Sequence, residues 1–306
     1  MRILLAIMMI LLTASPGFTQ DRVWLGKARM FTNDKLGDGQ DRWRTGSYTI
    51  SMIRGDEWQG GLPPSLGELM EYRLRSEIIA PSNLLNPIIG TDRRYVGVIG
   101  LGAFTHWDEG GVEYAVGAEL VVTGPQTGLG AFQDWIHQAL GMGSVQVLGS
   151  QIGNNVFPTL SSEIGHRFLL ADKGVKSLSF RPFVEAQAGA ETYIRLGGDF
   201  TFGPAGTADF KVRDTVTGFR NTAIKGNRPR GLSLLFGGDV AYVKSSKYLP
   251  TALGYTLQNP RIRLRAGVYH ETQNSSFFYG LTWLGKEFVN QPRGQLVGSF
   301  SVRMTF

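Results

Sequence analysis

The feature that most constrains this chain is an alternation of apolar and polar residues that recurs over long segments. In one of them, Ile262 and Leu264 alternate with Arg263. Successive side chains of a strand point to opposite faces, so a period of two predicts β-strands with one apolar face. The clearest segments cover residues 178–188, 192–202, 232–242 and 261–271. The chain is therefore expected to be an all-β protein.

The length of the alternating segments favours a membrane barrel over a soluble sandwich. Many are about 10–13 residues long, whereas soluble strands usually have about 5–6 and a tilted strand needs about 9–11 to cross a bilayer. Trp107, Tyr242 and Trp283 lie near strand ends, as in the aromatic girdles of outer-membrane barrels. No domain boundary interrupts residues 21–306, and the polar, glycine-rich stretch 204–229 is expected to be a long loop.

Twelve candidate strands can be counted, and an even number is the rule for single-chain bacterial outer-membrane barrels. They lie near residues 23–32, 46–54, 66–79, 94–107, 112–123, 151–169, 177–190, 191–203, 230–244, 261–272, 275–287 and 296–306. The predicted fold is a closed antiparallel transmembrane β-barrel of about 12 strands.

Both ends of the chain carry features of an exported barrel. Arg2 is followed by an apolar run from Ile3 to Leu12 and then by small residues, which predicts a signal peptide over residues 1–20. That run is shorter than the roughly 20 apolar residues of a membrane-spanning helix. At the other end, alternation continues to Phe306, and a terminal aromatic strand resembles the signal read by the outer-membrane assembly machinery. We expect a barrel in the bacterial outer membrane with Phe306 paired into its last strand.

The composition and the motifs exclude several other classes of protein. The chain has no cysteine, so no disulfide framework or thiolate metal site can form. Its net charge of +6 is spread without a basic block, and no nucleic-acid-binding module occurs, so no nucleic-acid partner is expected. The sequence also lacks a Gly-x-Ser-x-Gly nucleophile motif and a His-x-x-x-His zinc pair.

One segment breaks the strand pattern. Residues 130–141 contain helix formers and end in Gly141, which favours a short helix. Gln133 and His137 are four residues apart and would share one face of that helix. Among the four histidines, His137 is the best candidate for a general base, because it alone lies in a polar constellation and histidine titrates nearest to neutral pH. The alternative is a structural role for His137.

Strand parity brings polar residues from separate segments to one end of the barrel. With the N-terminus in the periplasm, the links between strands one and two and between strands five and six are extracellular. The residues placed on the extracellular rim in this way are Asn33, Asp34, Thr45 and His137. The simpler alternatives are a turn at Asn33-Asp34 and an ordinary strand position for Thr45.

Five short motifs follow one another in the first half of the chain. They are Asn33-Asp34, Asp41 to Gly46, Asp92 to Gly97, Gly124-Pro125 with Gln133 and His137, and Gln151 to Asn154. In this order they resemble the outer-membrane lipid A 3′-O-deacylase (LpxR-like) family. The resemblance covers about residues 23–155, and the remainder matches as barrel strands.

The resemblance implies a calcium-dependent ester hydrolase in a twelve-stranded barrel. Members of the family remove the 3′-acyloxyacyl chain of lipid A, the membrane anchor of lipopolysaccharide, in the outer leaflet. The catalytic residues of the family fall on Asn33, Asp34, Thr45 and His137, with Gln133 in a supporting position. Asp34 is the expected neighbour of the Ca²⁺ ion. His137 would deprotonate a water molecule, and calcium would stabilise the developing oxyanion.

Two positions depart from the family pattern. Gly143 stands where the family has a glutamate, six residues after the histidine, and no lysine occurs in the segment 82–91. The candidate replacements are Glu163, Lys173 and Lys176. Two other functions therefore stay open, namely a related phospholipid hydrolase and a non-enzymatic barrel that is porin-like or an inactive family member. A wide conducting lumen would favour the porin, and a plugged lumen would favour the hydrolase.

Overall fold

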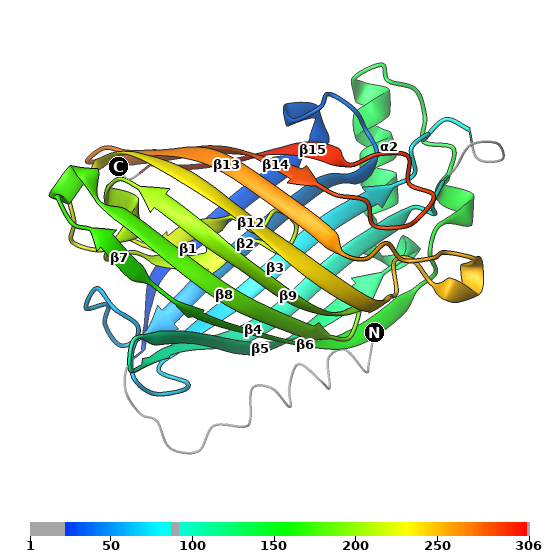
Figure 1. Ribbon diagram of the computed structural model, residues 1–306. Coiled ribbons are helices and arrows are strands. Elements are labelled where there is room, and N and C mark those ends of the chain that lie inside the picture. The colour runs from blue at the N-terminus through cyan, green and yellow to red at the C-terminus, as the bar shows by residue number, and fades with distance from the viewer. Residues whose placement is uncertain (1–21, 87–91, 305–306) are drawn as a thin grey trace.

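The structure of this protein is a computed structural model that describes residues 22–86 and 92–304. The expected signal peptide at residues 1–20 and the pairing of Phe306 lie outside the described residues, so both stay predictions. The described chain forms one closed antiparallel β-barrel with a short α-helix at one end (Figure 1).

The strands of the wall follow one another in chain order. They are β1 (Val23–Asn33), β2 (Trp43–Gly55), β3 (Leu69–Ala80), β4 (Val96–Glu109), β5 (Val112–Thr123), β6 (Asn155–His166), β7 (Phe168–Ala171), β8 (Leu178–Ala188), β9 (Glu191–Phe202), β12 (Gly231–Ser246), β13 (Arg261–Glu271), β14 (Ser275–Leu284) and β15 (Gln295–Met304). The helices are α2 (Leu129–Ala139) and the short 3-10 turns η1 (Asp34–Leu36), η2 (Pro125–Thr127), η3 (Leu148–Ser150), η4 (Gly174–Lys176), η5 (Pro204–Gly206) and η6 (Thr251–Leu253).

The sheet closes on itself at two places. β1 pairs with β15, with Phe31 opposite Phe300, and β6 pairs with β8. Only Arg167 separates β6 from β7, and both pair with β8, so they form one strand of the wall. The 13 strands of the described sheet therefore make a barrel of 13 − 1 = 12 wall strands. The predicted closed barrel and the predicted helix near residues 130–141 are both confirmed.

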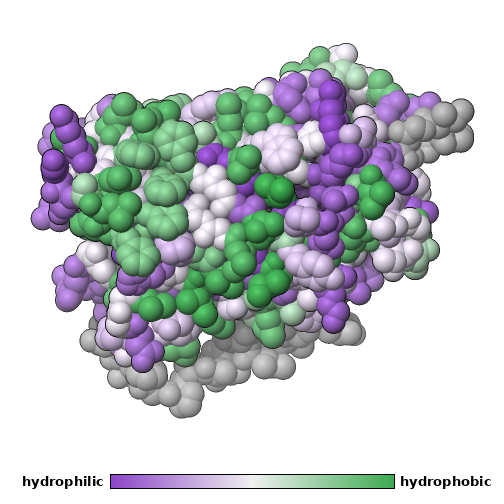
Figure 2. Space-filling view, viewed as in Figure 1, coloured by the Kyte–Doolittle hydropathy of each residue, from purple (hydrophilic) through white to green (hydrophobic). Residues whose placement is uncertain are grey.

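The two faces of the wall are reversed relative to a soluble protein. In β13, Leu264 is 55% exposed on the outer surface, whereas Arg263 and Arg265 are 5% and 4% exposed and face the interior. Figure 2 shows hydrophobic side chains gathered over the middle of the wall and hydrophilic ones toward its ends. This arrangement is stable when lipid surrounds the barrel. No helix within the described ranges is long and apolar enough to cross a membrane.

The stretch 204–229, which the sequence led us to expect as a long loop, folds into the barrel as a hairpin. It contains β10 (Phe210–Arg213) and β11 (Arg220–Ile224), which pair antiparallel. Its apolar side chains join inward-facing wall residues in one buried cluster of Ala28, Ile53, Leu69, Phe210, Val212, Ala223 and Ile224. The loop prediction was wrong because the surface against which this hairpin packs exists only once the barrel has closed.

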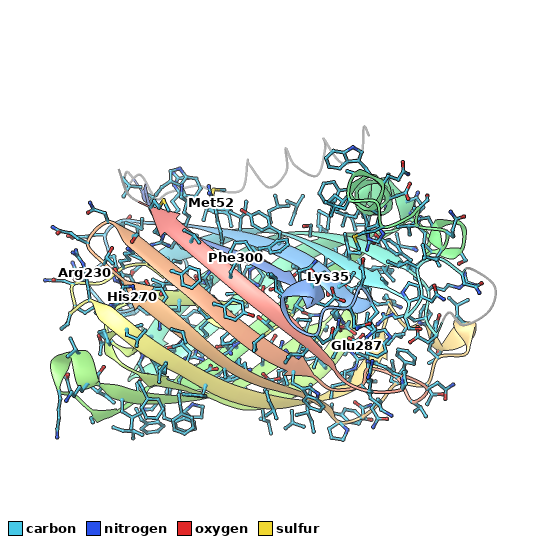
Figure 3. The ribbon with its side chains drawn as sticks, turned by 90° about the horizontal axis from the view of Figure 1, so that it is seen from above. Lys35, Met52, Arg230, His270, Glu287 and Phe300 are labelled. Carbon is cyan, nitrogen blue, oxygen red and sulfur yellow. The ribbon has the colours of Figure 1, made fainter. Side chains whose placement is uncertain are left out.

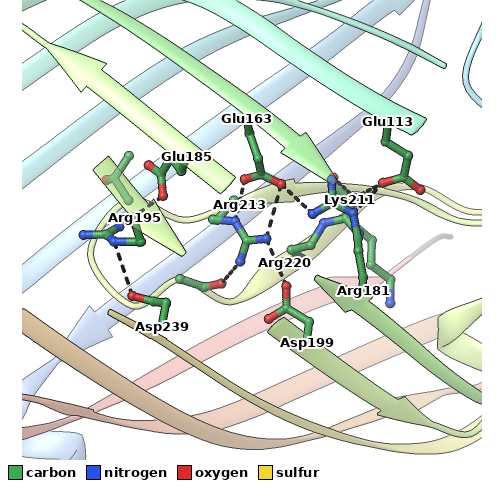
Figure 4. Close-up of polar contacts among 12 residues, drawn as sticks. Glu113, Glu163, Arg181, Glu185, Arg195, Asp199, Lys211, Arg213, Arg220 and Asp239 are labelled. Atoms are coloured by element: carbon green, nitrogen blue, oxygen red, sulfur yellow. Dashed lines mark hydrogen bonds and ion pairs between the residues drawn. The ribbon is translucent and has the colours of Figure 1, made fainter. Parts of the chain in front are cut away.

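Ion pairs between the hairpin and the wall fill the lumen further (Figure 4). Arg213 of β10 lies 2.6 Å from Glu163 and 2.9 Å from Asp199. Arg220 of β11 lies 3.3 Å from Glu113 on β5, the wall strand that pairs with β6. Buried charges are costly unless they are paired, so these contacts fix the hairpin in place. The lumen is therefore occupied by protein.

The long connections identify the outer end of the barrel. α2 and the connections β1–β2, β3–β4 and β5–β6 lie together at one end, and the end of β15 lies at the other (Figure 1). Seen from above, Lys35 and Glu287 lie toward the α2 end, whereas Arg230 and His270 lie toward the opposite end (Figure 3). Long loops face outward in outer-membrane barrels and both termini face the periplasm, so the α2 end is extracellular.

Candidate active site

Asp34 lies at the outer rim, in the 3-10 turn that follows β1. Its side chain is fully buried, at 0% exposure. One carboxylate oxygen, Oδ2, accepts the backbone N–H of Arg42 at 2.8 Å, and Oδ1 lies 2.9 Å from the Thr45 hydroxyl. Burial, together with the neighbouring carboxylates of Asp41 and Asp38, raises the pKa of Asp34 to about 8 despite these hydrogen bonds.

Thr45 joins Asp34 to a second carboxylate. Its Oγ1 lies 2.9 Å from Asp34 Oδ1 and 2.7 Å from Asp41 Oδ1. The register of β2 against β3 shifts between Arg44 and Gly46, and this bulge places Thr45. A hydroxyl has one proton to donate, so it cannot satisfy two ionised carboxylates at once. The pair of carboxylates therefore favours a proton or a cation between them.

Asp41 is the centre of the site. Its Oδ1 accepts a hydrogen bond from Gln133 Nε2 at 3.0 Å, and its Oδ2 lies 2.7 Å from His137 Nε2. The connection between β1 and β2 thus meets α2 through one carboxylate. The sequence placed Asp41 in a motif but gave it no role, because nothing in the chain indicates which loop residue faces a helix so distant in sequence. Its position four residues before Thr45 was the only available signal.

The inner face of α2 carries Gln133 and His137, one helical turn apart and both buried. Gln133 Oε1, His137 Nδ1 and the Tyr95 hydroxyl are buried atoms that form no hydrogen bond with any described residue. Burial, with a smaller contribution from the Asp41 carboxylate, raises the pKa of Tyr95. Buried polar atoms are nearly always paired, so three unpaired ones around Asp41 indicate a site built to contact a ligand, an ion or water.

The backbone between Asp41 and Thr45 is strained. Trp43 has φ of 51°, the one positive φ at a non-glycine position among the described residues. Its ring is 1% exposed, and its Nε1 donates to Asp92 Oδ2 at 2.6 Å. A bulky residue holds such a conformation only when its surroundings enforce it, and such strain is common at functional sites. The buried indole therefore fixes the direction in which this segment presents its polar side chains.

Asn33 reaches the same region but does not join the hydrogen bonds around Asp41. Its Oδ1 accepts the backbone N–H of Lys35 at 2.8 Å and so caps η1. It pairs across the sheet with Gly46. A Cβ atom added to Gly46 would lie 3.4 Å from Asn33 Nδ2, so the Asn33 amide packs close to that glycine. The structure thus brings Asp34, Thr45, Gln133 and His137 together around Asp41 and leaves Asn33 at the edge.

The candidate replacements for the missing family residues do not reach this site. Glu163 is bound in the lumen by Arg181 and Arg213, 2.6 Å from each. Lys173 and Lys176 lie in the connection after β7, at the periplasmic end. The lysines were wrongly proposed because strand parity places this connection at the end of the barrel opposite α2, and Glu163 was wrongly proposed because luminal arginines bind it. Gly143 has φ of +83°, a conformation that an L-glutamate would adopt only with strain.

The side chains around Asp41 offer the types of oxygen ligand that calcium prefers, but only a few of them. The described residues contain no group of three or more histidine, cysteine, aspartate or glutamate side chains arranged to hold a metal ion. Asp34, Asp41, Thr45 and Gln133 nevertheless offer carboxylate, hydroxyl and amide oxygens, which are the ligands that Ca²⁺ takes. The unpaired Gln133 Oε1 and the two carboxylates around one hydroxyl agree with a bound cation.

Comparison with solved structures shows proteins that share this fold. LpxR from Salmonella typhimurium shares the fold with a TM-score of 0.75 at 17% identity, over 92% of this chain and 100% of that chain. The NanC porin has a TM-score of 0.39 at 7% identity, over 92% of this chain and 100% of that chain. The β domain of the Bordetella autotransporter BrkA has a TM-score of 0.39 at 11% identity, over 92% of this chain and 99% of that chain. The last two likenesses are too weak to bear on function.

A comparison with curated proteins gave no match. The family model described as "Outer membrane protein LpxR" matches residues 3–306, which is nearly the whole chain. The match and the barrel agree with the resemblance seen in the motifs and with the predicted location. The chain therefore belongs to the LpxR family of outer membrane proteins.

Proposed function

We propose that this protein hydrolyses the 3′-acyloxyacyl ester of lipid A in the outer leaflet. The observation that carries the proposal is the 2.7 Å contact between His137 Nε2 and Asp41 Oδ2, buried at the outer rim of a barrel of the LpxR family. A histidine oriented by a carboxylate is the usual arrangement for a general base. The site lies at the end of the barrel that faces the lipopolysaccharide layer.

The geometry supports a proposed role for each residue in ester hydrolysis. His137 donates its Nε2–H to Asp41, which fixes the tautomer in which Nδ1 carries the lone pair. Nδ1 is the buried, unpaired nitrogen, so it would take the proton of the attacking water and pass it to the leaving alkoxide. Gln133 holds Asp41 from the same helix, and Thr45 holds it from β2. The Asn33 amide would donate a hydrogen bond at the edge of the site.

Calcium is the proposed cofactor. Asp34 and Asp41, with the oxygens of Thr45 and Gln133, would hold it. When bound there, it would polarise the ester carbonyl and stabilise the oxyanion. The low carboxylate count and the glycine at position 143 predict weak binding, with calcium needed at about millimolar concentration.

The filled lumen argues against the porin alternative. The hairpin β10–β11 and its ion pairs occupy the space through which a solute would pass. An inactive family member and a phospholipid hydrolase are the competing functions, since the same histidine and oxygen ligands would serve a phospholipid ester equally well.

Mass spectrometry of lipid A tests the proposal directly. Lipid A is extracted from cells that express the wild type, His137→Gln, or the matched control His270→Gln, which changes an exposed histidine at the periplasmic end. Lipid A from cells with the wild type or the control should lack the 3′-acyloxyacyl chain. Lipid A from cells with His137→Gln should retain it. If lipid A stays unchanged in cells that express the wild type at millimolar calcium, the protein is an inactive family member. Loss of phospholipid chains alone would indicate the phospholipid hydrolase.

A further inference from the structure

The helix α2 has its polar and apolar faces the wrong way round for an aqueous environment. Its polar residues Gln133 and His137 are 6% and 5% exposed and face the barrel. Its aromatic residues Phe132 and Trp135 are 51% and 65% exposed and face away from it. A surface helix of a soluble protein shows the opposite pattern. The pattern of α2 is the same as that of the barrel wall, whose outward face contacts lipid.

The exposed apolar surface extends beyond the two aromatic rings. Leu140 and Met142, just after the helix, are 69% and 36% exposed. The rings of Phe132 and Trp135 stack with centroids 6.2 Å apart. Clustered exposed apolar residues of this kind mark a contact with a partner or a membrane, in contrast to single exposed ones. We call the four side chains Phe132, Trp135, Leu140 and Met142 the apolar face of α2.

The apolar face of α2 adjoins the lipid-facing wall. The helix packs against β3 and β4 and stands at the outer strand ends (Figure 1). It begins a few residues after β5 ends at Thr123, and the chain returns to the wall at β6, where Val156 is 48% exposed. Continuity with the belt of the barrel indicates the same occupant, the acyl chains of the outer leaflet. Tryptophan is also the residue most typical of the boundary between acyl chains and head groups.

We propose that the apolar face of α2 inserts among the acyl chains at the top of the outer leaflet. His137 lies on the opposite face of the same short helix, so insertion holds the site at the depth where acyl chains join head groups. An ester bond of a membrane lipid lies at this depth. This last step rests on the proposed function, whereas the insertion itself does not.

Spin labelling measures insertion without any reference to activity. The chain has no cysteine, so single-cysteine variants can be labelled uniquely with a nitroxide. The test position is Trp135→Cys in the full-length protein, reconstituted in phospholipid vesicles. Leu160→Cys, 65% exposed on the wall strand β6, is the lipid-facing control. Gln146→Cys, exposed in the connection after α2, is the aqueous control.

The accessibility of each label to oxygen and to a water-soluble nickel chelate gives the result. The label at position 135 should match position 160, with high oxygen and low nickel accessibility. A label that matches position 146 would overturn the proposal. Dipolar broadening between labels at position 135 would also overturn it, because the face would then contact a second copy of the chain.

A second measurement connects insertion with the reaction. Phe132→Ser combined with Trp135→Ser should lower deacylation of lipid A in vesicles and leave deacylation in detergent micelles unchanged, whereas Gln138→Ser should change neither. Equal loss in both settings would contradict a role in membrane placement. If the wild type deacylates nothing in either setting, the proposed function fails, and the labelling result still decides whether the helix inserts.

Discussion

Asp41 Oδ2 lies 2.7 Å from His137 Nε2, so one carboxylate joins the loop before β2 to the only α-helix of the described chain. The same carboxylate also contacts Thr45 and Gln133 through Oδ1. Three side chains from two elements, β2 and α2, therefore depend on Asp41 for their relative positions.

Replacement of Asp41 by asparagine should lower deacylation by roughly 10²–10⁴-fold, because the histidine loses the acceptor that fixes its tautomer. The pH–rate profile should also shift, since the imidazolium loses its stabilising charge, and a purely structural role would not produce that shift. Asp172→Asn, in the periplasmic connection after β7, is the control. If Asp41→Asn deacylates lipid A as fast as the wild type, Asp41 has no role in the mechanism.

Replacement of Asp34 by asparagine should cost activity and leave the calcium-free protein as stable as before or more stable. An acid whose pKa rises on folding, here to about 8, destabilises the fold as pH rises above its unfolded pKa, and this cost disappears with the carboxyl group. Thermal unfolding in calcium and in chelator measures the effect. Calcium should raise the melting temperature of the wild type but not that of the variant. An equal rise in both would place calcium elsewhere.

Replacement of Arg213 by alanine should destabilise the barrel by about 3–5 kcal/mol, since it leaves Glu163 and Asp199 as buried carboxylates with one cation fewer. Urea unfolding in detergent provides the measurement. Arg230→Ala removes an exposed arginine next to β12 and should change little. Similar stability of both variants would mean that the luminal ion pairs contribute no net free energy.

The luminal hairpin should keep the barrel closed to ions. In planar lipid bilayers, the wild type is expected to give no steady channel conductance. A variant in which a short Gly/Ser linker replaces residues 207–228 should conduct, because the plug is gone while the wall remains. A large steady conductance from the wild type would revive the porin alternative.

Deletion of Phe306 should reduce the yield of assembled barrel without changing the activity of the molecules that do assemble. Phe300, Val302 and Met304 of β15 are all exposed on the outer face, so the alternation that leads to Phe306 is on the lipid side. Heat-modifiable migration in gels counts assembled barrels, and activity per barrel serves as the internal control. Normal yield after deletion would contradict a role in recognition by the assembly machinery.

The sequence by itself determined the wall of the barrel. Period-two alternation such as Ile262, Arg263 and Leu264 depends only on neighbouring residues, because lipid outside and polar side chains inside impose one rule on every strand. The helix around Gln133 and His137 could likewise be predicted from neighbouring residues. Strand parity then placed Asp34 and His137 at one end, since each crossing reverses the direction of the chain.

Only the tertiary structure decided which side chains come into contact within the barrel. The hairpin β10–β11 was predicted as a loop because its packing surface belongs to strands far away in sequence. Asp41 received no role because its partners Thr45 and His137 lie on different elements. Glu163 was wrongly proposed as a replacement for a similar reason, because its partners Arg181 and Arg213 lie on other elements. Alternation is a property of one strand, whereas a site and a plug are contacts between segments that the closed barrel brings together.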